Sequence, residues 1–441
     1  MKRINYILLL AATMMASSCS DEVVSTADNQ VLSFEVVAEQ ATRAEHVYCN
    51  SYLMPNFHLW ARQDNGNPYI DNETCTRQGN TNSYTLPASR YVPKNDMYLE
   101  FYAVYNTVKA TGNADSEGFH YTHTGAAEGG NAKYIVFTPA PEAKDQKDLL
   151  YAASRYRSTT DISSGVIGLN FRHLLSQVVF KAQVTNEHLH VEIDEIKFCN
   201  LKSTGKWTPV SGLDQFTNRN LNGHASAEAG ANSPSYADKE IGSWTSWNTK
   251  EYTTGLLQET YDEKRSNGTS LSTVKVTGAI QVPYNNGAVK NLTEETNTVD
   301  GHTNNTSFTH SFLLLPQTTT AWNPATPAKP ASQAGAYMLV KCKIWNVSDP
   351  SLGVIRDPNN GANRDTPLWY TKSGNTETTR YVAIPVNVNW QSGRKYTYKL
   401  VFGKTTFGGY DPESGKKVLV PIEVKVTVDD FVKVTQPNTN M

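Results

Sequence analysis

The chain has 441 residues, of which 19% are charged, and its formal net charge is −2. This length suffices for two or three ordinary domains. The near-zero charge gives no support to nucleic acid or an anionic lipid surface as the partner. Tyr, Asn, Thr and Gly are abundant, which favours β-strands joined by long polar loops over a helical bundle. The composition therefore predicts an all-β protein.

The N-terminus has the pattern of an export signal. Lys2 and Arg3 form a positively charged start, and an apolar run at residues 6–16 follows. This run is too short to cross a bilayer as a stable helix. The small residues before Cys19 fit the cleft of a signal peptidase, and a thiol at this place is the group to which diacylglycerol is attached. Residues 1–19 are therefore predicted to be a lipoprotein signal peptide, with Cys19 as the lipidation site.

The residues after Cys19 indicate where the chain is sent. Two or more acyl chains, at about 0.8 kcal/mol per buried methylene, would anchor it durably. Asp21 and Glu22 resemble the acidic tag that sends some lipoproteins to the outer face of the outer membrane. We therefore expect an outer-membrane lipoprotein at the cell surface. The alternative is an ordinary secretory signal with an incidental cysteine.

Four further cysteines are Cys49, Cys75, Cys199 and Cys342. They form no close C-x-x-C pair, which argues against a zinc knuckle. Cys342 alternates with apolar residues and is predicted to be a buried free thiol on a strand. A bridge between Cys49 and Cys75 stays open, because an oxidising compartment would allow it.

Apolar residues alternate with polar ones along most of the chain, which is the period of a β-strand. The first clear case is Leu32, Phe34 and Val36. Further strands are predicted at residues 97–106, 178–184, 312–315, 337–345, 382–388 and 396–402, and the last alternation comprises Val418, Val420, Ile422, Val424, Val426 and Val428.

One predicted strand changes its face partway. Val191 and Ile193 share a face, whereas Ile196 and Phe198 continue one residue out of register. Because one extra residue reverses the facing of everything after it, a β-bulge is predicted at residues 194–195.

The segment at residues 158–168 (STTDISSGVIG) is rich in small and polar residues. We place a boundary there, between an N-terminal β domain at 44–168 and a C-terminal β domain at 169–441. The second domain carries a polar insertion at about 213–274. No short repeat is present, which argues against a solenoid or a propeller.

Signatures of catalysis are absent from the sequence: it has no G-x-S-x-G elbow, no P-loop and no H-E-x-x-H. His173 and Ser176 lie in one turn, where a structural role is the better interpretation. Paired carboxylates for glycoside hydrolysis cannot be assigned. We therefore expect no enzyme, no catalytic residue and no cofactor.

Metal binding is also not supported by the spacing of ligand residues. His188 and His190 would share a strand face, and His120 and His123 form a second pair. Neither pair has a carboxylate or cysteine at a definable spacing. The loop at 357–365 lacks the bidentate glutamate of a Ca²⁺ loop. We expect no metal.

The tryptophans separate into two groups. Trp60, Trp345 and Trp390 lie in strand-like contexts and are predicted to be core residues. Trp244 and Trp247 lie in the polar insertion, where they either pack the loop or stack on a sugar. A surface glycan-binding lipoprotein is therefore an alternative function.

Several segments follow one another in a characteristic order: the Cys19 lipobox, VLSFEVV at 31–37 with Ala41-Thr42-Arg43-Ala44, DLLYA at 148–152, LNFRHLLSQVVF at 169–180, the strand and turn at 193–204, LLLPQ at 313–317, WQSGRKYTYKL at 390–400 and the strand at 424–431. This order resembles the fimbrillin-like family, whose members are lipoprotein precursors of type V pilins. Two features depart from the family pattern: the insertion is long, and the final strand ends in Asp429-Asp430-Phe431, where an aspartate followed by tryptophan is expected.

The resemblance implies two tandem β-sandwich domains of transthyretin-like type and polymerisation by strand exchange. The strand with Leu32, Phe34 and Val36 can fill an open groove of its own domain. Cutting the chain after this strand would free it, and a strand from another subunit could replace it. Residues 20–43 are then a propeptide with a removable strand.

The resemblance also implies the place of the cut. In the family a trypsin-like protease cleaves after an arginine or lysine at this position, which corresponds to the bond between Arg43 and Ala44. The alternative is that Arg43 is an ordinary solvated residue in a turn.

The candidate donor strand comprises Val418, Val420, Ile422, Val424 and Val426, and its alternative is the last strand of the second sandwich. Few residues follow it, which favours a tip or accessory subunit of a pilus over a stalk subunit, with a role in adhesion. An uncleaved anchor subunit is the alternative. The expected partners are other pilin subunits, the outer membrane through the lipid on Cys19, a processing protease and a host or glycan ligand, but no nucleic acid.

Overall fold

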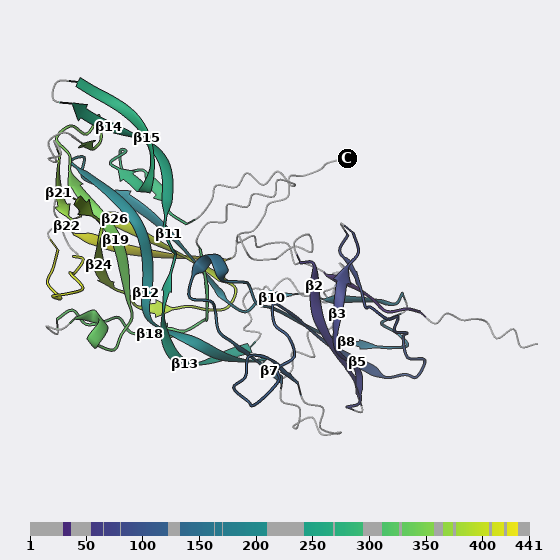
Figure 1. Ribbon diagram of the computed structural model, residues 1–441. Helices are drawn as coiled ribbons and strands as arrows, with labels where there is room; N and C mark the ends of the chain where they lie inside the picture. Colours follow the sequence, from purple (N-terminus) through teal and green to yellow (C-terminus); the bar gives the residue numbers. More distant parts are fainter. Residues whose placement is uncertain are drawn as a thin grey trace, which may run out of the picture.

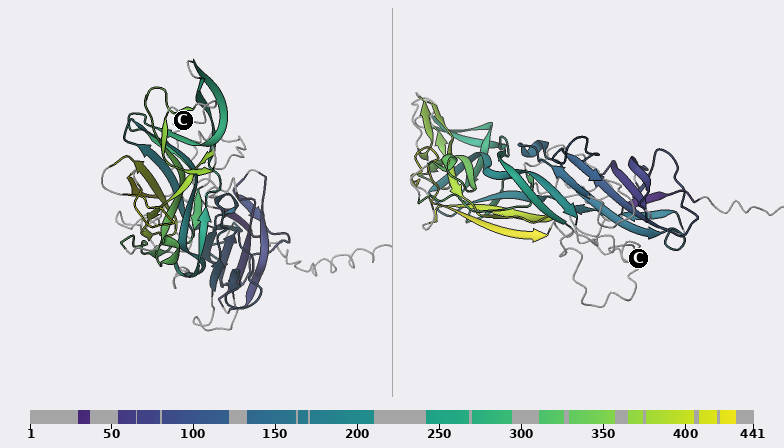
Figure 2. Two further views of the ribbon diagram at one scale, coloured as in Figure 1. Left: turned by 60° about the vertical axis from the view of Figure 1, so that its left-hand side comes forward. Right: turned by 90° about the horizontal axis from the view of Figure 1, so that it is seen from below.

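The protein is built almost entirely of β-strands, which confirms the predicted all-β class. In the computed structural model an N-terminal and a C-terminal region follow each other along an elongated molecule (Figures 1 and 2). Helical turns in the described part are η1 (Ala143–Asp145) and η4 (Pro330–Ser332). The structure describes residues 30–36, 54–64, 66–79, 81–121, 133–162, 164–169, 171–209, 242–267, 270–293, 311–325, 329–356, 365–373, 376–404, 408–418 and 421–430.

Within those ranges, no helix is long and apolar enough to cross a membrane.

The N-terminal region is one eight-stranded sheet. In sheet order its strands are β10 (Arg172–His173), β8 (Leu150–Arg157), β5 (Tyr98–Tyr105), β2 (Asn56–Gln63), β3 (Pro68–Arg77), β4 (Ser83–Thr85), β1 (Ser33–Val36) and β9 (Val166–Leu169). β2, β3 and β4 are consecutive in the sequence as well as in the sheet, whereas the other neighbouring strands are further apart in the chain.

This sheet curls until its two halves face each other. β1 is separated from β5 by three strands, yet the rings of Phe34 and Phe101 lie edge to face with centroids 5.9 Å apart. Near the ends of the sheet, the hydroxyl of Tyr156 in β8 contacts the backbone of Gly168 in β9. The curled sheet therefore encloses an apolar core of its own.

The C-terminal region contains two larger sheets that face each other. The first has five strands, and its outer strand β27 is the last strand described in the chain. Its strands are β16 (Val289–Asn291), β11 (Ser176–Val184), β26 (Arg394–Phe402), β27 (Ile422–Asp430) and, paired to β11, β17 (Phe312–Leu314).

The second C-terminal sheet has ten strands and is organised around β12, which is 21 residues long. Two strand pairs, β18 (Thr318–Thr319) with β25 (Val388–Asn389) and β22 (Thr371–Ser373) with β23 (Thr376–Thr378), complete the region. The strands of the ten-stranded sheet are β20 (Ile355–Arg356), β14 (Gln258–Asn267), β15 (Ser270–Pro283), β12 (Leu189–Pro209), β19 (Tyr337–Asn346), β21 (Thr366–Trp369), β13 (Gly242–Thr253), β24 (Arg380–Pro385), β6 (Gly118–Tyr121) and β7 (Lys133–Phe137).

The main core lies between these two sheets. Phe180 of β11 and Tyr398 of β26 pack against Phe198 of β12, with ring centroids 5.6 and 5.5 Å apart. All three side chains are buried. The C-terminal region is thus two sheets face to face, whereas the N-terminal region is one curled sheet. The transthyretin-like detail of both stays a prediction.

A second apolar cluster joins the two regions. Tyr151 of β8 packs on Trp207 of β12 with ring centroids 4.7 Å apart. β6 and β7 lie between N-terminal strands in sequence, but β7 pairs with β12 and β6 pairs with β7. Asp148 and His173, both buried, form a contact of 2.6 Å where the chain leaves the N-terminal sheet. The domain boundary at residue 168 stays a prediction. Both β9, which ends at Leu169, and β10, which begins at Arg172, belong to the N-terminal sheet.

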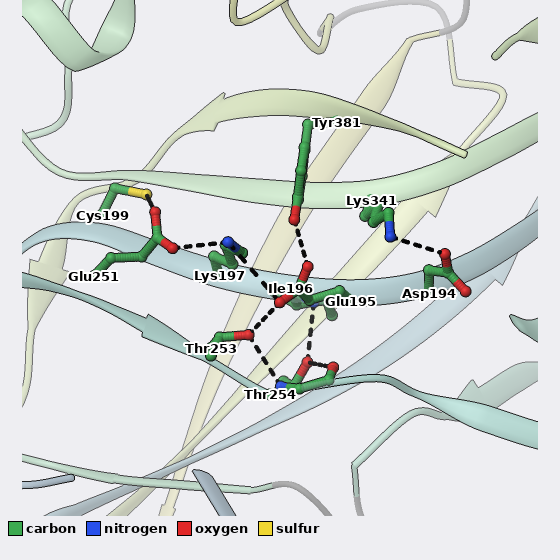
Figure 3. A network of polar contacts seen from close by, with 11 residues as sticks. Asp194, Glu195, Ile196, Lys197, Cys199, Glu251, Thr253, Thr254, Lys341 and Tyr381 are labelled. Carbon is green, nitrogen blue, oxygen red and sulfur yellow. Dashed lines mark hydrogen bonds and ion pairs between the residues drawn. The ribbon is translucent and has the colours of Figure 1, made fainter. Parts of the chain in front are cut away.

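The predicted bulge in β12 is confirmed. The pairing of β12 with β19 shifts between Ile193 and Glu195, and polar contacts hold the two bulge residues (Figure 3). Asp194 pairs with Lys341 at 3.3 Å, and Glu195 accepts a hydrogen bond from the hydroxyl of Tyr381. The bulge turns these carboxylates to the outer face while Ile193 remains in the core.

The predicted insertion at 213–274 is only partly described. Its described part contains β13 and β14, and β13 pairs with β12 along most of its length. Residues 210–241 lie outside the described ranges.

Candidate functional site

The strand with Leu32, Phe34 and Val36 is β1, which lies inside the N-terminal sheet. It is antiparallel to β4, with Phe34 opposite Tyr84, and parallel to β9, with Phe34 opposite Ile167. We call the position between β4 and β9 the β1 slot. A strand of only four residues therefore bridges two strands on opposite sides.

The apolar side chains of β1 face the core. Leu32, Phe34 and Val36 are 2%, 0% and 4% exposed, whereas Ser33 and Glu35 face outward. Burying a side chain of this kind stabilises a fold by about 1.5–3 kcal/mol. Residues 32–36 thus contribute three side chains to the N-terminal core.

Backbone hydrogen bonds fix both ends of β1. The Leu32 N–H donates to the Arg90 carbonyl at 2.7 Å, and the Val36 N–H donates to the Asn82 carbonyl at 3.0 Å. The Ser33 N–H donates to the Gly165 carbonyl at 2.9 Å. These bonds set the register of the strand in the slot.

Gly165 is adapted to this close approach. Its φ of +72° lies in the left-handed region that glycine adopts most easily. A Cβ at this position would lie 2.6 Å from the carbonyl oxygen of Val31. A larger residue would therefore push against the backbone that enters β1.

β9 has a second attachment besides β1. Among the described residues its strand pairing is to β1, but the Tyr156 hydroxyl donates to the Gly168 carbonyl at 3.1 Å and accepts from the Gly168 N–H at 2.9 Å. Burial raises the pKa of Tyr156 to about 12, which keeps this donor protonated. The far wall of the slot is therefore tied to β8.

Three residues predicted for processing lie outside the described residues. These are the lipidation site Cys19 and the two residues of the expected cut, Arg43 and Ala44. Their roles stay predictions.

The candidate donor strand lies at an edge of the five-stranded sheet. β27 pairs with β26 along its whole length. Val420 lies outside the described residues, Val418 and Val424 are half-buried and Ile422 is buried in the main core, whereas Val426 is 44% exposed. Whether this segment leaves its sheet stays a prediction.

The histidines tested for chemistry have structural partners. His173 is paired with Asp148, and burial raises the pKa of that carboxyl group while His173 opposes the shift. The Ser176 hydroxyl donates to the Gln391 carbonyl at 2.8 Å. His188 contacts the Val347 carbonyl. These groups are engaged in holding the fold.

No group of three or more potential ligand residues suited to a metal occurs among the described residues. His190 contacts Gln281 at 2.7 Å. In the loop predicted at 357–365, only Asp365 is described, and it accepts from the N–H groups of Ser348 and Ile355.

The cysteines described are free and buried: Cys75, Cys199 and Cys342, which confirms the prediction for Cys342. Burial raises the pKa of all three thiols. Cys49, the other half of the bridge left open above, lies outside the described residues.

Trp60, Trp345 and Trp390 are core residues, as predicted. Trp244 packs against the cluster between the two regions, and its indole N–H donates to the Leu174 carbonyl at 3.0 Å. Trp247 is half-buried on β13. The sequence indicated a polar loop here, but Trp244 serves the junction between the regions.

Gly165 and Tyr156 were not predicted as part of the site. A glycine between polar residues and a strand is a weak signal for a close backbone approach. Tyr156 resembles any other inward tyrosine in a strand, so nothing in the sequence indicates its contact with Gly168.

Comparison with known proteins shows a family likeness over part of the chain. The model of the fimbrillin-like family matches residues 55–257. This part of the chain, somewhat less than half of its length, is therefore similar to fimbrillin-like proteins. The match begins just before β2 and reaches the end of β13, so it includes β9 and most other strands around the β1 slot. No curated protein matches the chain.

Two solved structures similar to the chain are fimbrial by their descriptions. A fimbrial protein from Bacteroides vulgatus is 14% identical, with a TM-score of 0.49, and the match covers 92% of this chain and 100% of that one. A fimbrial assembly protein from Parabacteroides distasonis is 12% identical, with a TM-score of 0.33, and the match covers 91% and 98%.

Proposed function

We propose that the chain is a surface fimbrial subunit with a role in adhesion, assembled by strand exchange at the β1 slot. The observation that supports this most is the placement of β1. It lies N-terminal to Arg43, fills the space between β4 and β9, and buries Leu32, Phe34 and Val36. The proposal gives the chain a role in assembly rather than catalysis.

β1 is suited to being replaced. Its removal would leave two strand edges unpaired beside an apolar floor: the edge of β4 that faces away from β3, and the edge of β9 that faces β1. Exposed strand edges of this kind pair readily with another extended chain. The contact between Tyr156 and Gly168 would keep β9 in place meanwhile. The vacant slot therefore favours the binding of a new strand.

The proposal also connects the lipid with assembly. In the precursor, β1 lies in the propeptide at residues 20–43, and the lipidated Cys19 directly precedes this propeptide. The outer-membrane anchor and β1 are therefore on the same side of the cut. Cleavage between Arg43 and Ala44 would leave that segment bound only by β1. Its displacement by a donor strand would then release the subunit from the membrane and join it to the fibre in one step.

The pairing of β27 supports the position that we propose for the chain in the fibre. This strand pairs with β26 from Ile422 to Asp430, and its withdrawal would uncover Tyr396 and Tyr398, which are 4% and 1% exposed. A subunit whose last strand is committed in this way accepts a strand more readily than it donates one. We therefore assign a tip or accessory role.

N-terminal sequencing of the protein from intact cells and from sheared fimbriae tests the proposal. We expect a mature chain that starts at Ala44 in the fimbrial fraction, and a chain that stays in the membrane when Arg43→Gln removes the cut. Lys109→Gln, a change at an exposed basic residue elsewhere, is the control. A mature chain that starts at lipidated Cys19 would make it an uncleaved anchor. Absence from fimbriae altogether would contradict the proposal.

A further inference from the structure

We infer that the β1 slot selects its donor strand by the size of one side chain, the one at the position of Phe34, and that this chain's own last strand is not that donor. The inference rests on the proposed strand exchange. It names the partner by its chemistry: a strand of a different subunit, apolar at three alternate positions, with a phenylalanine-sized side chain at the central one.

The central position of the slot is the largest. Phe34 is 0% exposed, its ring contacts the ring of Phe101 edge to face, and its strand neighbours Tyr84 and Ile167 are also fully buried. The flanking positions hold the smaller side chains of Leu32 and Val36. The slot therefore holds an aromatic side chain at its central position and a smaller aliphatic side chain at each flanking position.

The walls cannot collapse easily onto a smaller side chain. Phe101 is itself packed on Tyr156, with ring centroids 6.2 Å apart, and Tyr156 is held by two hydrogen bonds to Gly168. Closely packed interiors relax only in part when a large side chain is replaced by a small one, and the remaining cavity lowers stability. A valine at the central position would leave most of the volume of a phenyl ring empty.

The register of the incoming strand is restricted as well. A shift by one residue would turn its apolar side chains outward. The Gly165 carbonyl accepts a hydrogen bond from the Ser33 N–H, and the Gly165 backbone lies close to that of Val31. This close packing leaves little room for the incoming strand to enter the slot in another position. The donor strand therefore cannot shift along the slot to bring a better-fitting residue to the central position.

The last strand of this chain does not have the required residue. Its apolar face carries Ile422, Val424, Val426 and Val428, without an aromatic residue. Pro421 lacks an N–H group, so two registers of this strand remain: residues 422, 424 and 426, or residues 424, 426 and 428, in the three apolar positions. The central residue is a valine in both. The flanking residues, Ile or Val, are close in size to Leu32 and Val36. The mismatch is confined to the central position.

A peptide-exchange experiment on the full-length chain tests this inference. A site for a sequence-specific protease is inserted between Arg43 and Ala44, the purified protein is cut, and fluorescent peptides are added. The probes are residues 29–38, the same peptide with Phe34→Leu, Phe34→Val or Phe34→Ala, residues 421–430, and residues 421–430 with Val424→Phe or with Val426→Phe. Anisotropy gives the affinities, and native mass spectrometry gives the composition of each complex.

We expect the peptide with Phe34 to displace the original segment. The Phe34→Val peptide and the unmodified 421–430 peptide should bind at least about tenfold more weakly. Val424→Phe or Val426→Phe should make the 421–430 peptide bind at least about tenfold more tightly than the unmodified one, when the new phenylalanine occupies the central position.

The outcomes separate the inference from the proposed function. If all peptides, including 421–430, bind as tightly as the Phe34 peptide, the size selection is wrong while strand exchange stands. If no peptide binds, not even the one with Phe34, strand exchange itself is wrong. If 421–430 binds tightly and Val424→Phe or Val426→Phe weakens it, the chain's own strand is the fitting donor and the inference is overturned.

Discussion

β1 and β27 are both alternating apolar strands near an end of the chain, but they occupy opposite kinds of place. β1 has four residues, a strand on each side and a fully covered apolar face. β27 has nine residues, a neighbour on one side and valines that become exposed along its length. Alternation therefore predicts a strand and its inner face. It does not predict whether the strand is enclosed or lies at an edge.

The difference arises from distant neighbours. β1 is enclosed because β9, which follows β1 by about 130 residues in the sequence, returns to lie beside it. β27 has no such neighbour among the described residues, so its valines at 426 and 428 are exposed although they lie on the same face of the strand as the buried Ile422. The same pattern thus gives a core strand in one region and an edge strand in the other.

The largest contrast between the strands is expected from truncating their side chains. Phe34→Ala should lower the free energy of unfolding by about 3–5 kcal/mol, since it creates a cavity in a closed core. Val428→Ala, at a position that is 56% exposed, should change it by less than about 0.5 kcal/mol. Urea unfolding of the two variants provides the measurement. Equal effects would mean that β1 is not part of the core.

A comparison within β27 sharpens the contrast. Ile422 is buried in the main core, whereas Val426 is 44% exposed. Ile422→Ala should therefore cost about 2–5 kcal/mol, and Val426→Ala should cost well under half of that. If both variants unfold at the same urea concentration as the unmodified chain, β27 is dispensable for folding, and our reason for a tip or accessory role is lost.

Acid should act on the C-terminal region through His190. Burial lowers the pKa of His190 to about 4, and the nearby Arg356 and Lys290 act in the same direction, while its contact with Gln281 opposes them. The folded chain keeps this ring neutral between pH 6.5 and 4, whereas the unfolded chain takes up a proton there. Stability should therefore fall as the pH is lowered through this window, by at most roughly 3 kcal/mol from this residue.

The variant His190→Gln removes the titrating group from β12 and serves as the reference for this effect. We expect the slope of unfolding free energy against pH to be flatter in the variant between pH 6.5 and 4. An unchanged slope would show that His190 does not contribute to the pH dependence.

The smallest expected effect separates the clash at Gly165 from backbone strain. Gly165 and Gly255 have nearly the same φ, +72° and +70°, but only Gly165 has the backbone of Val31 close to where a Cβ would lie. Gly255→Ala should cost about 1 kcal/mol from strain alone. Gly165→Ala should cost about 1–2 kcal/mol more and should speed the loss of β1 from the cut protein. Identical losses in both variants would contradict a tight approach at Gly165.

Much of the local structure could be predicted because it depends on side-chain periodicity. The all-β class, the bulge at Asp194, the buried thiol of Cys342 and the core position of Trp60 follow from alternation alone. The assignment of strands to sheets could not be predicted in the same way. β6 and β7 lie in the N-terminal half of the sequence but extend the C-terminal sheet, since their apolar residues complete the junction around Trp207.

The candidate site was predictable only in part. The inner face of β1 could be assigned from Leu32, Phe34 and Val36, because a strand of period two shows which residues are buried. Its walls could not, because β4 and β9 are short and their apolar patterns are too brief to identify. The hydrogen bonds of Tyr156 depend on the curl of the sheet, which no local pattern indicates.

The central claim is that β1 can be removed from a slot that otherwise stays formed. Hydrogen exchange of the full-length protein, before and after cleavage beyond Arg43 and removal of the freed segment, tests it most directly. We expect the amides of β4 and β9 to lose protection while those of β11, β12 and β26 stay protected, and we expect added peptide 29–38 to restore the original pattern. Protection that is unchanged at β4 and β9, or lost throughout the chain, would contradict the account.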